Sequence, residues 1–328
     1  MDLDRESLYE NLTEKNFVQF YNSFNSVSEL IEFFKSRKRA EVKSFLIKSE
    51  NDSEITAIIP TKSIESKFVK IHSKKLRGIN IIFVESMGPL FNFSYSMNIG
   101  ISEAIRLKSK FLMLSNDDIF PLSNIQKLQD EVVTNSEKYD IFIPEIFSGK
   151  EYLSPQQSIY IQSCLTQHII TNNFMSWMNP SDISKTSRKL ASKLNIYNDA
   201  NVIRYIILRE NDPIFRKSQS LFSGNIREYV VRKNNKFLIK INNVQPVSII
   251  KTELLKSERF DESFVNGGED TDLSVRLAIN GAKVYKLKEQ FQNFGGRSLG
   301  QNIDRILKNT LPEILILGYK LNQYFNLI

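Results

Sequence analysis

The amino-acid sequence predicts an α/β protein whose central sheet is mostly parallel and flanked by helices. Three observations lead to this class. From about residue 55, short apolar runs alternate with amphipathic stretches, the apolar runs have the length of strands, and polar residues follow each run. Strands that alternate with helices form βαβ units, whose strands are parallel. Ligands bind beyond the carboxyl ends of such strands, so the residues after each strand are the first site candidates.

The alternating pattern predicts four strands and three helices. The strands are expected at 55–59, 79–84, 111–114 and 141–143, and the helices at 64–75, 97–108 and 121–133. In the helical stretches the apolar residues recur on one face, whereas the strand stretches are short and apolar throughout. Each predicted strand therefore has the continuous apolar character of a strand buried on both faces.

The first fifty residues have a helical pattern instead. Phe17, Phe20, Tyr21 and Phe24 follow the i, i+3, i+4, i+7 spacing of a helix face, and Ser26 to Glu29 has the form of a capping box. We expect a helical extension packed on the main domain. An arm that binds a partner or a membrane surface is the alternative.

Composition excludes several classes of protein. With 41% hydrophobic and 25% charged residues, the chain is neither collagen-like, nor mostly disordered, nor a disulfide scaffold. It has one cysteine and two histidines, too few for the usual zinc sites, so a catalytic metal would be Mg²⁺ or Mn²⁺ on carboxylates. No apolar run is long enough to span a bilayer and the first residues are acidic, so we expect a cytoplasmic protein without a signal peptide.

The excess positive charge is concentrated in one segment. Residues 204–240 hold nine basic and three acidic residues, a net charge of 9 − 3 = +6 against +7 for the whole chain. A solvated face is the simpler interpretation, and a surface for an anionic acceptor or lipid headgroup is the functional one. No nucleic-acid motif lies here, so we expect no nucleic-acid partner. Within the segment, two β-prone runs around Asn234-Asn235 predict a hairpin.

The apolar tail at 311–328 also has a structural and a functional interpretation. It is too short and too interrupted to span a membrane. We expect it to pack in the core. Docking at the inner face of an anionic membrane, beside the basic segment, is the alternative.

Two acidic blocks carry the candidate chemistry. The loop Ser115-Asn116-Asp117-Asp118 follows the third strand, and its spacing fits either a metal site or a cap for the helix near Pro121. The second block, 260–277, places Glu269, Asp270 and Asp272 at the start of a helix, directly after Gly267-Gly268. Paired glycines permit close approach of the backbone to a ligand, and a carboxylate among carboxylates is a candidate general base.

These motifs together resemble glycosyltransferase family 2, inverting enzymes with the GT-A fold, a Rossmann-like α/β fold. The similarity runs in order over roughly 55–145 and 244–300. It consists of a first strand with Pro60-Thr61, a second strand ending at Glu85, Asn98-Ile99-Gly100, the DXD-like loop 116–118, and the elements FDE, EDTDL and RL between Phe260 and Leu277. The chain departs from the family pattern at Asn116 and Glu85, where Asp is usual, and at Asn293, where His is often found.

The resemblance implies a hexosyltransferase-like enzyme. It would move a sugar from a nucleotide-diphosphate-sugar to a hydroxyl group of a carbohydrate, lipid-linked or protein-linked acceptor. It implies Mn²⁺ or Mg²⁺ on Asp118 with Asp117, and Asp270 as the base beside Glu269. The nucleotide-sugar contacts implied are Pro60, Thr61, Glu85, Asn98, Asn116 and Asp117, and the diphosphate or acceptor contacts are Arg297, Asp272 and Gly268. The departures leave an alternative, a catalytically degenerate GT-A protein that binds a nucleotide-sugar or a glycan.

The resemblance also divides the chain into five parts. Residues 1–50 are the helical extension and 51–150 the nucleotide-sugar-binding half. Residues 151–243 are a divergent insert on the acceptor side, and 244–300 are the acceptor and catalytic half. Residues 301–328 form a helical tail.

Overall fold

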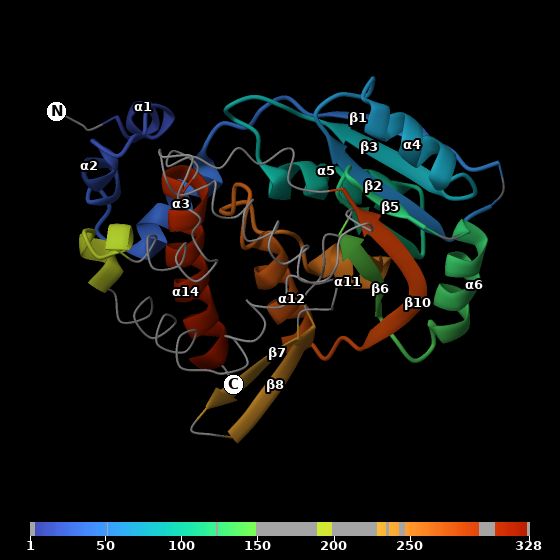
Figure 1. The fold of residues 1–328 in the computed structure, drawn as a ribbon. Helices are drawn as coiled ribbons and strands as arrows, with labels where there is room; N and C mark the ends of the chain where they lie inside the picture. Colours follow the sequence, from blue (N-terminus) through green and yellow to red (C-terminus); the bar gives the residue numbers. More distant parts are fainter. Residues whose placement is uncertain are drawn as a thin grey trace.

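The computed structural model describes residues 4–50, 52–122, 124–148, 189–198, 228–233, 236–242, 247–294 and 306–326. Its centre is an eight-stranded sheet with the strand order β1-β3-β2-β4-β9-β6-β10-β5 (Figure 1). The strands are β1 (Lys43–Ile47), β2 (Ile55–Thr61), β3 (Asn80–Glu85), β4 (Phe111–Ser115), β5 (Ile119–Pro121), β6 (Ile141–Ser148), β9 (Val247–Lys251) and β10 (Val284–Asn293).

Five of these strands run in one direction, which confirms the predicted α/β class. Strand β2 is parallel to both β3 and β4, and β6 is parallel to β10. Strand β9 lies between β4 and β6 and is antiparallel to both, so β4 and β6 share one direction. The other two antiparallel strands, β1 and β5, are the edges of the sheet. The carboxyl ends of β2, β3 and β4 therefore lie side by side.

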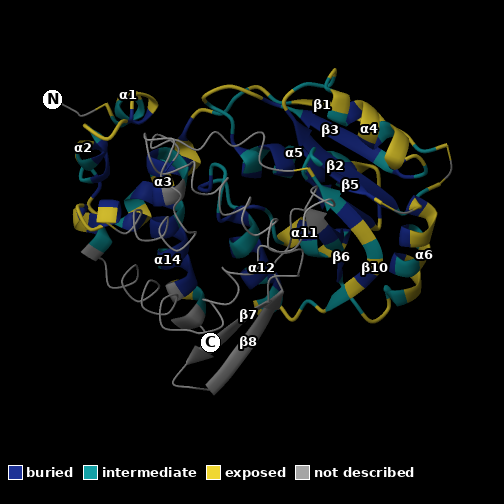
Figure 2. Cartoon of the chain, viewed as in Figure 1, coloured by how far each residue is buried: buried dark blue, intermediate teal, exposed yellow. Residues whose placement is uncertain are grey.

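Helices cover both faces of the sheet, and each face has its own apolar core (Figure 2). One face packs against α4 (Lys67–Lys75) and α6 (Ile125–Asn135). The other packs against α5 (Phe93–Arg106), α11 (Thr252–Ser257) and α12 (Glu269–Ile279). Because helices shield both faces, the central strands are buried along their whole length, as their continuous apolar sequences predict.

A third core joins the two ends of the described chain. The helices α1 (Arg5–Glu10), α2 (Phe17–Tyr21) and α3 (Val27–Ser36) pack with α14 (Leu311–Asn326). The predicted spacing is confirmed, since Phe17, Phe20, Tyr21 and Phe24 are all buried in this cluster. The Tyr21 hydroxyl donates to the Leu307 carbonyl at 2.5 Å. The extension is therefore packed on the domain, as the simpler interpretation predicted.

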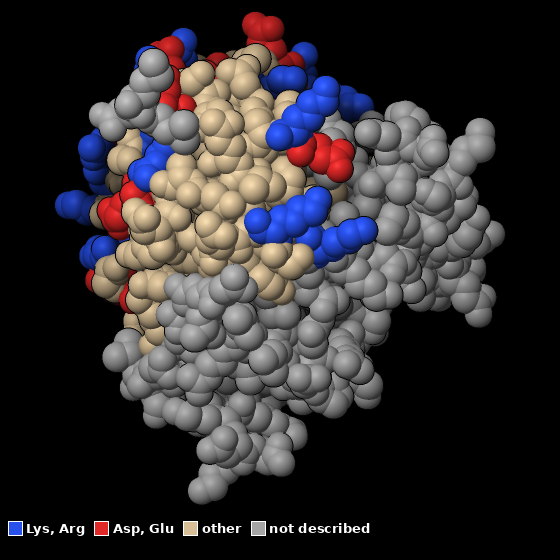
Figure 3. All heavy atoms as spheres, turned by 90° about the vertical axis from the view of Figure 1, so that its left-hand side faces the viewer, with Lys and Arg blue, Asp and Glu red and all other residues tan. Residues whose placement is uncertain are grey.

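Helix α14 confirms the core interpretation of the tail. Its apolar residues Ile314, Leu315, Leu317 and Leu321 are all buried in the third core. Figure 3 views the molecule from the side of α1–α3, where the described surface carries both basic and acidic side chains around an uncharged region. None of the described helices is long and apolar enough to cross a membrane.

Four strands differ from the sequence prediction. Residues 43–47, expected within the helical extension, form the edge strand β1 beside β3. Pro121, expected to begin a helix, instead ends β5, which pairs with β10, and α6 begins only after its cap, Asn124. Strands β9 and β10 were not predicted. All four depend on pairing with strands that are remote in sequence, which local periodicity does not reveal.

The predicted hairpin and the predicted cap at Ser26 are both confirmed. Strands β7 (Glu228–Lys233) and β8 (Lys236–Asn242) pair antiparallel around residues 234–235. The Ser26 side chain accepts from the Glu29 amide at 3.2 Å and caps α3. Most of the basic segment and most of the predicted insert lie outside the described residues.

Candidate active site

The ends of β2 and β3 bring the first two predicted residues together. Thr61 and Glu85 are register partners in the parallel ladder, so they lie side by side at the carboxyl edge of the sheet. The Glu85 carboxylate accepts from the Ile64 amide at 2.7 Å, which fixes it across the loop that leaves β2. Pro60 is buried within β2, one residue before this edge.

The neighbouring strand β4 supplies two carboxylates to the same edge. The Thr61 hydroxyl donates to Asp117 Oδ2 at 3.3 Å, and Asp118 is the next residue. Burial, and then the charge of Asp118, raise the pKa of Asp117 to about 6, against the opposing hydrogen bond from Thr61. Burial also raises the pKa of Asp118. The structure thus crowds two acids into a partly buried loop where each resists ionisation.

These two acids do not cap a helix. Asn124 caps α6 through its side chain, and β5 separates Asp118 from that helix. Of the two interpretations of the loop, the cap is therefore wrong. The carboxylates are left available at the ligand-binding edge of the sheet.

Oxygen ligands of this kind fit a magnesium or manganese ion. Mg²⁺ is commonly bound through one or two carboxylates, with water and substrate phosphates completing the shell. Among the described residues, no group of three or more His, Cys, Asp or Glu side chains is arranged to hold a metal. Asp117 and Asp118 supply two carboxylates of this kind.

The end of β10 crosses the acidic loop. Asn293 is the register partner of Ile119, the residue after Asp118, and the Phe294 amide donates to the Asp118 carbonyl at 2.9 Å. The segment that departs from the family pattern at Asn293 therefore adjoins the DXD-like loop. Arg297, predicted to contact a diphosphate, lies outside the described residues.

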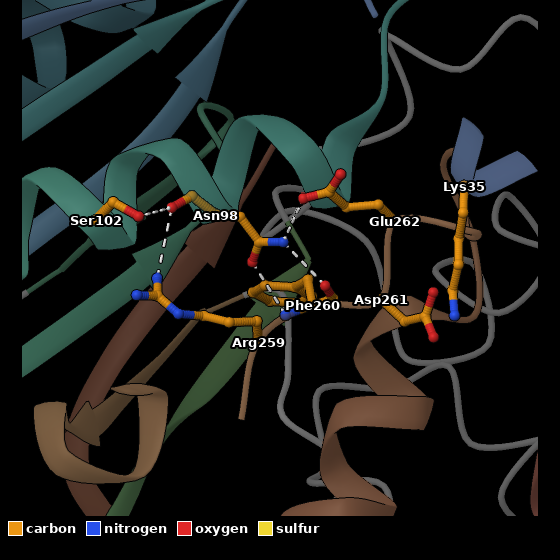
Figure 4. A pocket seen from close by; sticks show the side chains of 7 residues that line it. All are labelled: Lys35, Asn98, Ser102, Arg259, Phe260, Asp261 and Glu262. Atoms are coloured by element: carbon orange, nitrogen blue, oxygen red, sulfur yellow. Dashed lines mark hydrogen bonds between the residues drawn. The ribbon is translucent and has the colours of Figure 1, made fainter. Parts of the chain in front are cut away.

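Asn98, predicted to contact the nucleotide-sugar, makes hydrogen bonds to the segment 260–262. It lies on α5, where its side-chain amide donates to the Phe260 carbonyl and to Glu262 Oε1, both at 2.9 Å, and its Oδ1 accepts from the Phe260 amide. Figure 4 shows this clamp beside an open groove of about 530 Å³, which Lys35 and Arg259 also line. The side chain thus holds the 260–262 segment against α5.

A second clamp brings α12 to the same edge of the sheet. Asn92, the cap of α5, donates to the carbonyls of Glu262 and Phe264, and the Phe93 amide donates to the Val265 carbonyl. Since α5 begins on the side of the sheet where β3 ends, the segment that leads into α12 lies at the carboxyl edge of the sheet. Sequence reasoning did not find Asn92, although an Asn before a helical stretch is a typical cap.

The start of α12 carries the second predicted pair of acids. Gly268 adopts φ 83°, and an added Cβ there would lie 2.8 Å from the Glu313 side chain of α14. Glu269 is buried, and the Gly267 amide donates to it at 2.6 Å. Burial first, and then the charges of Asp270 and Glu313, raise the pKa of Glu269 well above its usual range. The Asp270 carboxylate accepts from the Thr271 amide at 2.7 Å.

Asp272, three residues after Glu269 on α12, is fully buried. Arg276 contacts one of its oxygens at 2.9 Å, and the Tyr324 hydroxyl donates to the other at 2.7 Å. Lys320 lies 3.5 Å from that second oxygen and is also paired with Asp261. These contacts give Asp272 a supporting role, because they join α12 to α14.

No protein-family model matches the chain, and no curated protein sequence matches it. The solved structures that align over most of the chain include two with TM-scores of 0.36 and 0.37. Protein A197 from STIV aligns over 74% of this chain and 86% of its own, at 12% identity and a TM-score of 0.36. TarS from S. aureus aligns over 73% of this chain but 36% of its own, at 12% identity and a TM-score of 0.37. At these TM-scores neither similarity carries an argument about activity.

Proposed function

We propose that this chain is an inverting glycosyltransferase of the GT-A, family 2 type. It would move a sugar from a nucleotide-diphosphate-sugar to an acceptor hydroxyl group. The observation that supports this best is the convergence of Thr61, Glu85, Asp117 and Asp118 at the carboxyl edge of one sheet. The acidic start of α12 is tied to the same edge, so a donor-side cluster and a candidate base share one region.

In this proposal the donor lies across the ends of β2, β3 and β4. Thr61, Glu85 and Asn116 form the nucleoside side, and Asp117 and Asp118 face the diphosphate. Those two carboxylates would hold Mn²⁺ or Mg²⁺, which would stabilise the charge that develops on the leaving diphosphate. The raised pKa of Asp117 supports this assignment, because two crowded acids favour a cation between or beside them.

Asp270 is the proposed general base. It would take the proton from the acceptor hydroxyl as the oxygen attacks the anomeric carbon, and the bond from that carbon to the diphosphate oxygen would break. Burial and nearby charges raise the pKa of Glu269 beside it to about 8, so Glu269 is protonated at neutral pH and cannot accept a further proton. The acceptor class, whether glycan or glycolipid, depends on residues of the 151–243 region.

A panel of nucleotide-sugars tests this function. Ligand binding to the native state raises its stability by about 2.7 kcal/mol at one hundred times Kd, enough to shift the melting temperature. UDP-, GDP-, CMP- and dTDP-linked sugars would be added with and without Mn²⁺. We expect one nucleotide to shift the melting temperature only with Mn²⁺, and Asp118→Ala to abolish that shift.

Asp52→Ala is the matched control, because Asp52 is an exposed acid before β2. The nucleotide-sugar and Mn²⁺ should shift the melting temperature of Asp52→Ala as much as that of the wild type. A donor shift that is equal in Asp118→Ala and wild type would remove Asp118 from the site. Binding of a donor without hydrolysis or transfer would favour the degenerate GT-A binding protein instead.

A further inference from the structure

Beneath the acidic loop lies a histidine that the proposed mechanism does not use. His72 is on α4 and is fully buried. Its Nε2 lies 3.1 Å from the Asp117 carbonyl oxygen, and its ring centroid lies 4.4 Å from that of Phe120 on β5. One side chain therefore contacts both the loop that carries the acids and the strand that follows it.

The partner of His72 determines the direction of this hydrogen bond. A carbonyl oxygen can only accept, so the ring nitrogen that faces it must carry a proton. Nε2 therefore donates to the Asp117 carbonyl oxygen. Nδ1 is buried and has no hydrogen-bond partner in the described part of the chain.

The loop backbone is thus anchored at two successive residues. His72 binds the Asp117 carbonyl, and the Phe294 amide binds the Asp118 carbonyl at 2.9 Å. Two adjacent acids repel each other and would separate in a free loop. Anchoring both carbonyls fixes the backbone from which the two carboxylates project, and so limits their separation.

We propose that His72, as its Nε2–H tautomer, is a positioning residue that holds Asp117 and Asp118 in the arrangement that binds a divalent cation. This inference rests on the proposed function, because it takes the two acids to be the metal site. The competing explanation is that His72 only fills space between α4 and β5. The hydrogen bond distinguishes the two explanations, because a residue that only fills space needs no hydrogen-bond donor.

Two variants separate the hydrogen bond from packing. His72→Phe keeps an aromatic ring against Phe120 and removes the donor. His72→Gln loses the ring and keeps an N–H group at a similar reach. Phe68→Leu is the control, because Phe68 lies on the same helix and its ring centroid lies 5.9 Å from that of Phe120. Mn²⁺ affinity would be measured on each folded variant, well below its melting temperature.

We expect His72→Phe to weaken Mn²⁺ binding roughly tenfold or more, as is typical when a residue that orients a metal ligand is lost. His72→Gln and Phe68→Leu should bind Mn²⁺ close to the wild-type level. Equal affinities in His72→Phe and wild type would overturn the proposal. So would a loss in His72→Phe that is matched by His72→Gln.

The tautomer supplies a readout that needs no metal. The chain has two histidines, so the ring nitrogens of His72 can be assigned in ¹⁵N-labelled protein by their loss in His72→Gln. We expect the Nε2–H tautomer, and the Nδ1–H tautomer would overturn the proposal. If wild-type protein binds no Mn²⁺, the metal role of Asp117 and Asp118 in the proposed function fails. The tautomer then decides by itself whether His72 anchors the loop.

Discussion

Asp117 shows how a single residue at the site weakens the fold. Its folded-state pKa of about 6 lies above the ordinary value of 3.8, so the folded form holds the proton more tightly than the unfolded chain does. The free energy of unfolding therefore falls as pH rises from about 4 to about 6 and stays lower above that range. The whole shift corresponds to at most about 3 kcal/mol, and partial exposure reduces it.

We therefore expect Asp117→Asn to stabilise the metal-free protein at pH 7.5 and to have little effect at pH 4. An amide keeps the shape and can still accept from Thr61, but it carries no charge. Urea unfolding at the two pH values, with Asp52→Asn as the exposed control, measures the difference. A stability gap that does not grow with pH would show that Asp117 ionises freely in the folded protein.

The two acids at the start of α12 should differ in catalysis. Glu269 is buried beside Asp270 and Glu313 and is protonated at neutral pH, so Glu269→Gln preserves both its charge and its shape. Asp270→Asn removes the proposed base, whose contribution is typically ~10²–10⁴-fold. We expect a loss of turnover of at least about 10²-fold in Asp270→Asn and a much smaller loss in Glu269→Gln, with similar donor affinity in both. The opposite order would make Glu269 the base.

At the scale of elements, one glycine sets the distance between α5 and the sheet. A Cβ on Gly100 would lie 2.3 Å from Ile58 Cγ2 and 2.9 Å from Val84 Cγ2. Both neighbours belong to buried central strands, so α5 would have to move outward. We expect Gly100→Ala to lower the free energy of unfolding by about 1–3 kcal/mol, the usual cost of overpacking.

Urea denaturation measures this effect, with Ser102→Ala on the same helix as control. Ser102 is half-buried and its hydroxyl donates to the Asn98 carbonyl one turn earlier, so its loss should change stability far less. Because α5 also holds Asn92 and Asn98, a shift of this helix would loosen the 260–265 segment. A stable Gly100→Ala protein would mean that the contact between α5 and the sheet can relax without cost.

The elements that the sequence predicts well are those with a local signal. Strands β2, β3 and β4 have continuous apolar sequences, and their polar ends place Thr61, Glu85 and Asp117 correctly at one edge. The edge strand β1 has a weaker signal, since only Phe45-Leu46-Ile47 is apolar, and all five of its residues are exposed. Its pairing with β3 makes it a strand. His72 was missed for a related reason, because nothing in the sequence around α4 reveals that the 117–120 loop covers it.

Asn98 and Asp272 show a second limit of sequence reasoning. Both belong to the motifs that resemble the family, and a motif alone does not separate residues that contact a ligand from residues that support the site. Only the contacts of Asn98 with Phe260, and of Asp272 with Arg276 and Tyr324, reveal the supporting role. Phe260 lies 162 residues from Asn98, and Tyr324 lies 52 residues from Asp272. Local sequence patterns do not reveal contacts at such separations.

At the scale of the whole molecule, a buried polar network joins the third core to the start of α12. Lys320 of α14 is nearly buried and pairs with both Asp261 and Asp272. Burial alone would raise the pKa of Asp261, but Lys320 and the Ser263 hydrogen bonds outweigh it and lower the pKa to about 2. The N-terminal helices pack on α14, so this network connects the extension to the helix that carries Asp270.

Breaking the network should therefore affect both stability and the site. Lys320→Met keeps the apolar stem but leaves Asp261 and Asp272 buried without that cation, and loss of one partner of a buried ion pair typically costs about 3–5 kcal/mol. Lys256→Met, in an exposed pair with Glu253, is the control and should cost well under about 1 kcal/mol. Because the cost comes from the acids left behind, adding Asp261→Asn to Lys320→Met should recover part of it. If the two lysine variants unfold at the same urea concentration, the ends of the chain do not support α12 through this network.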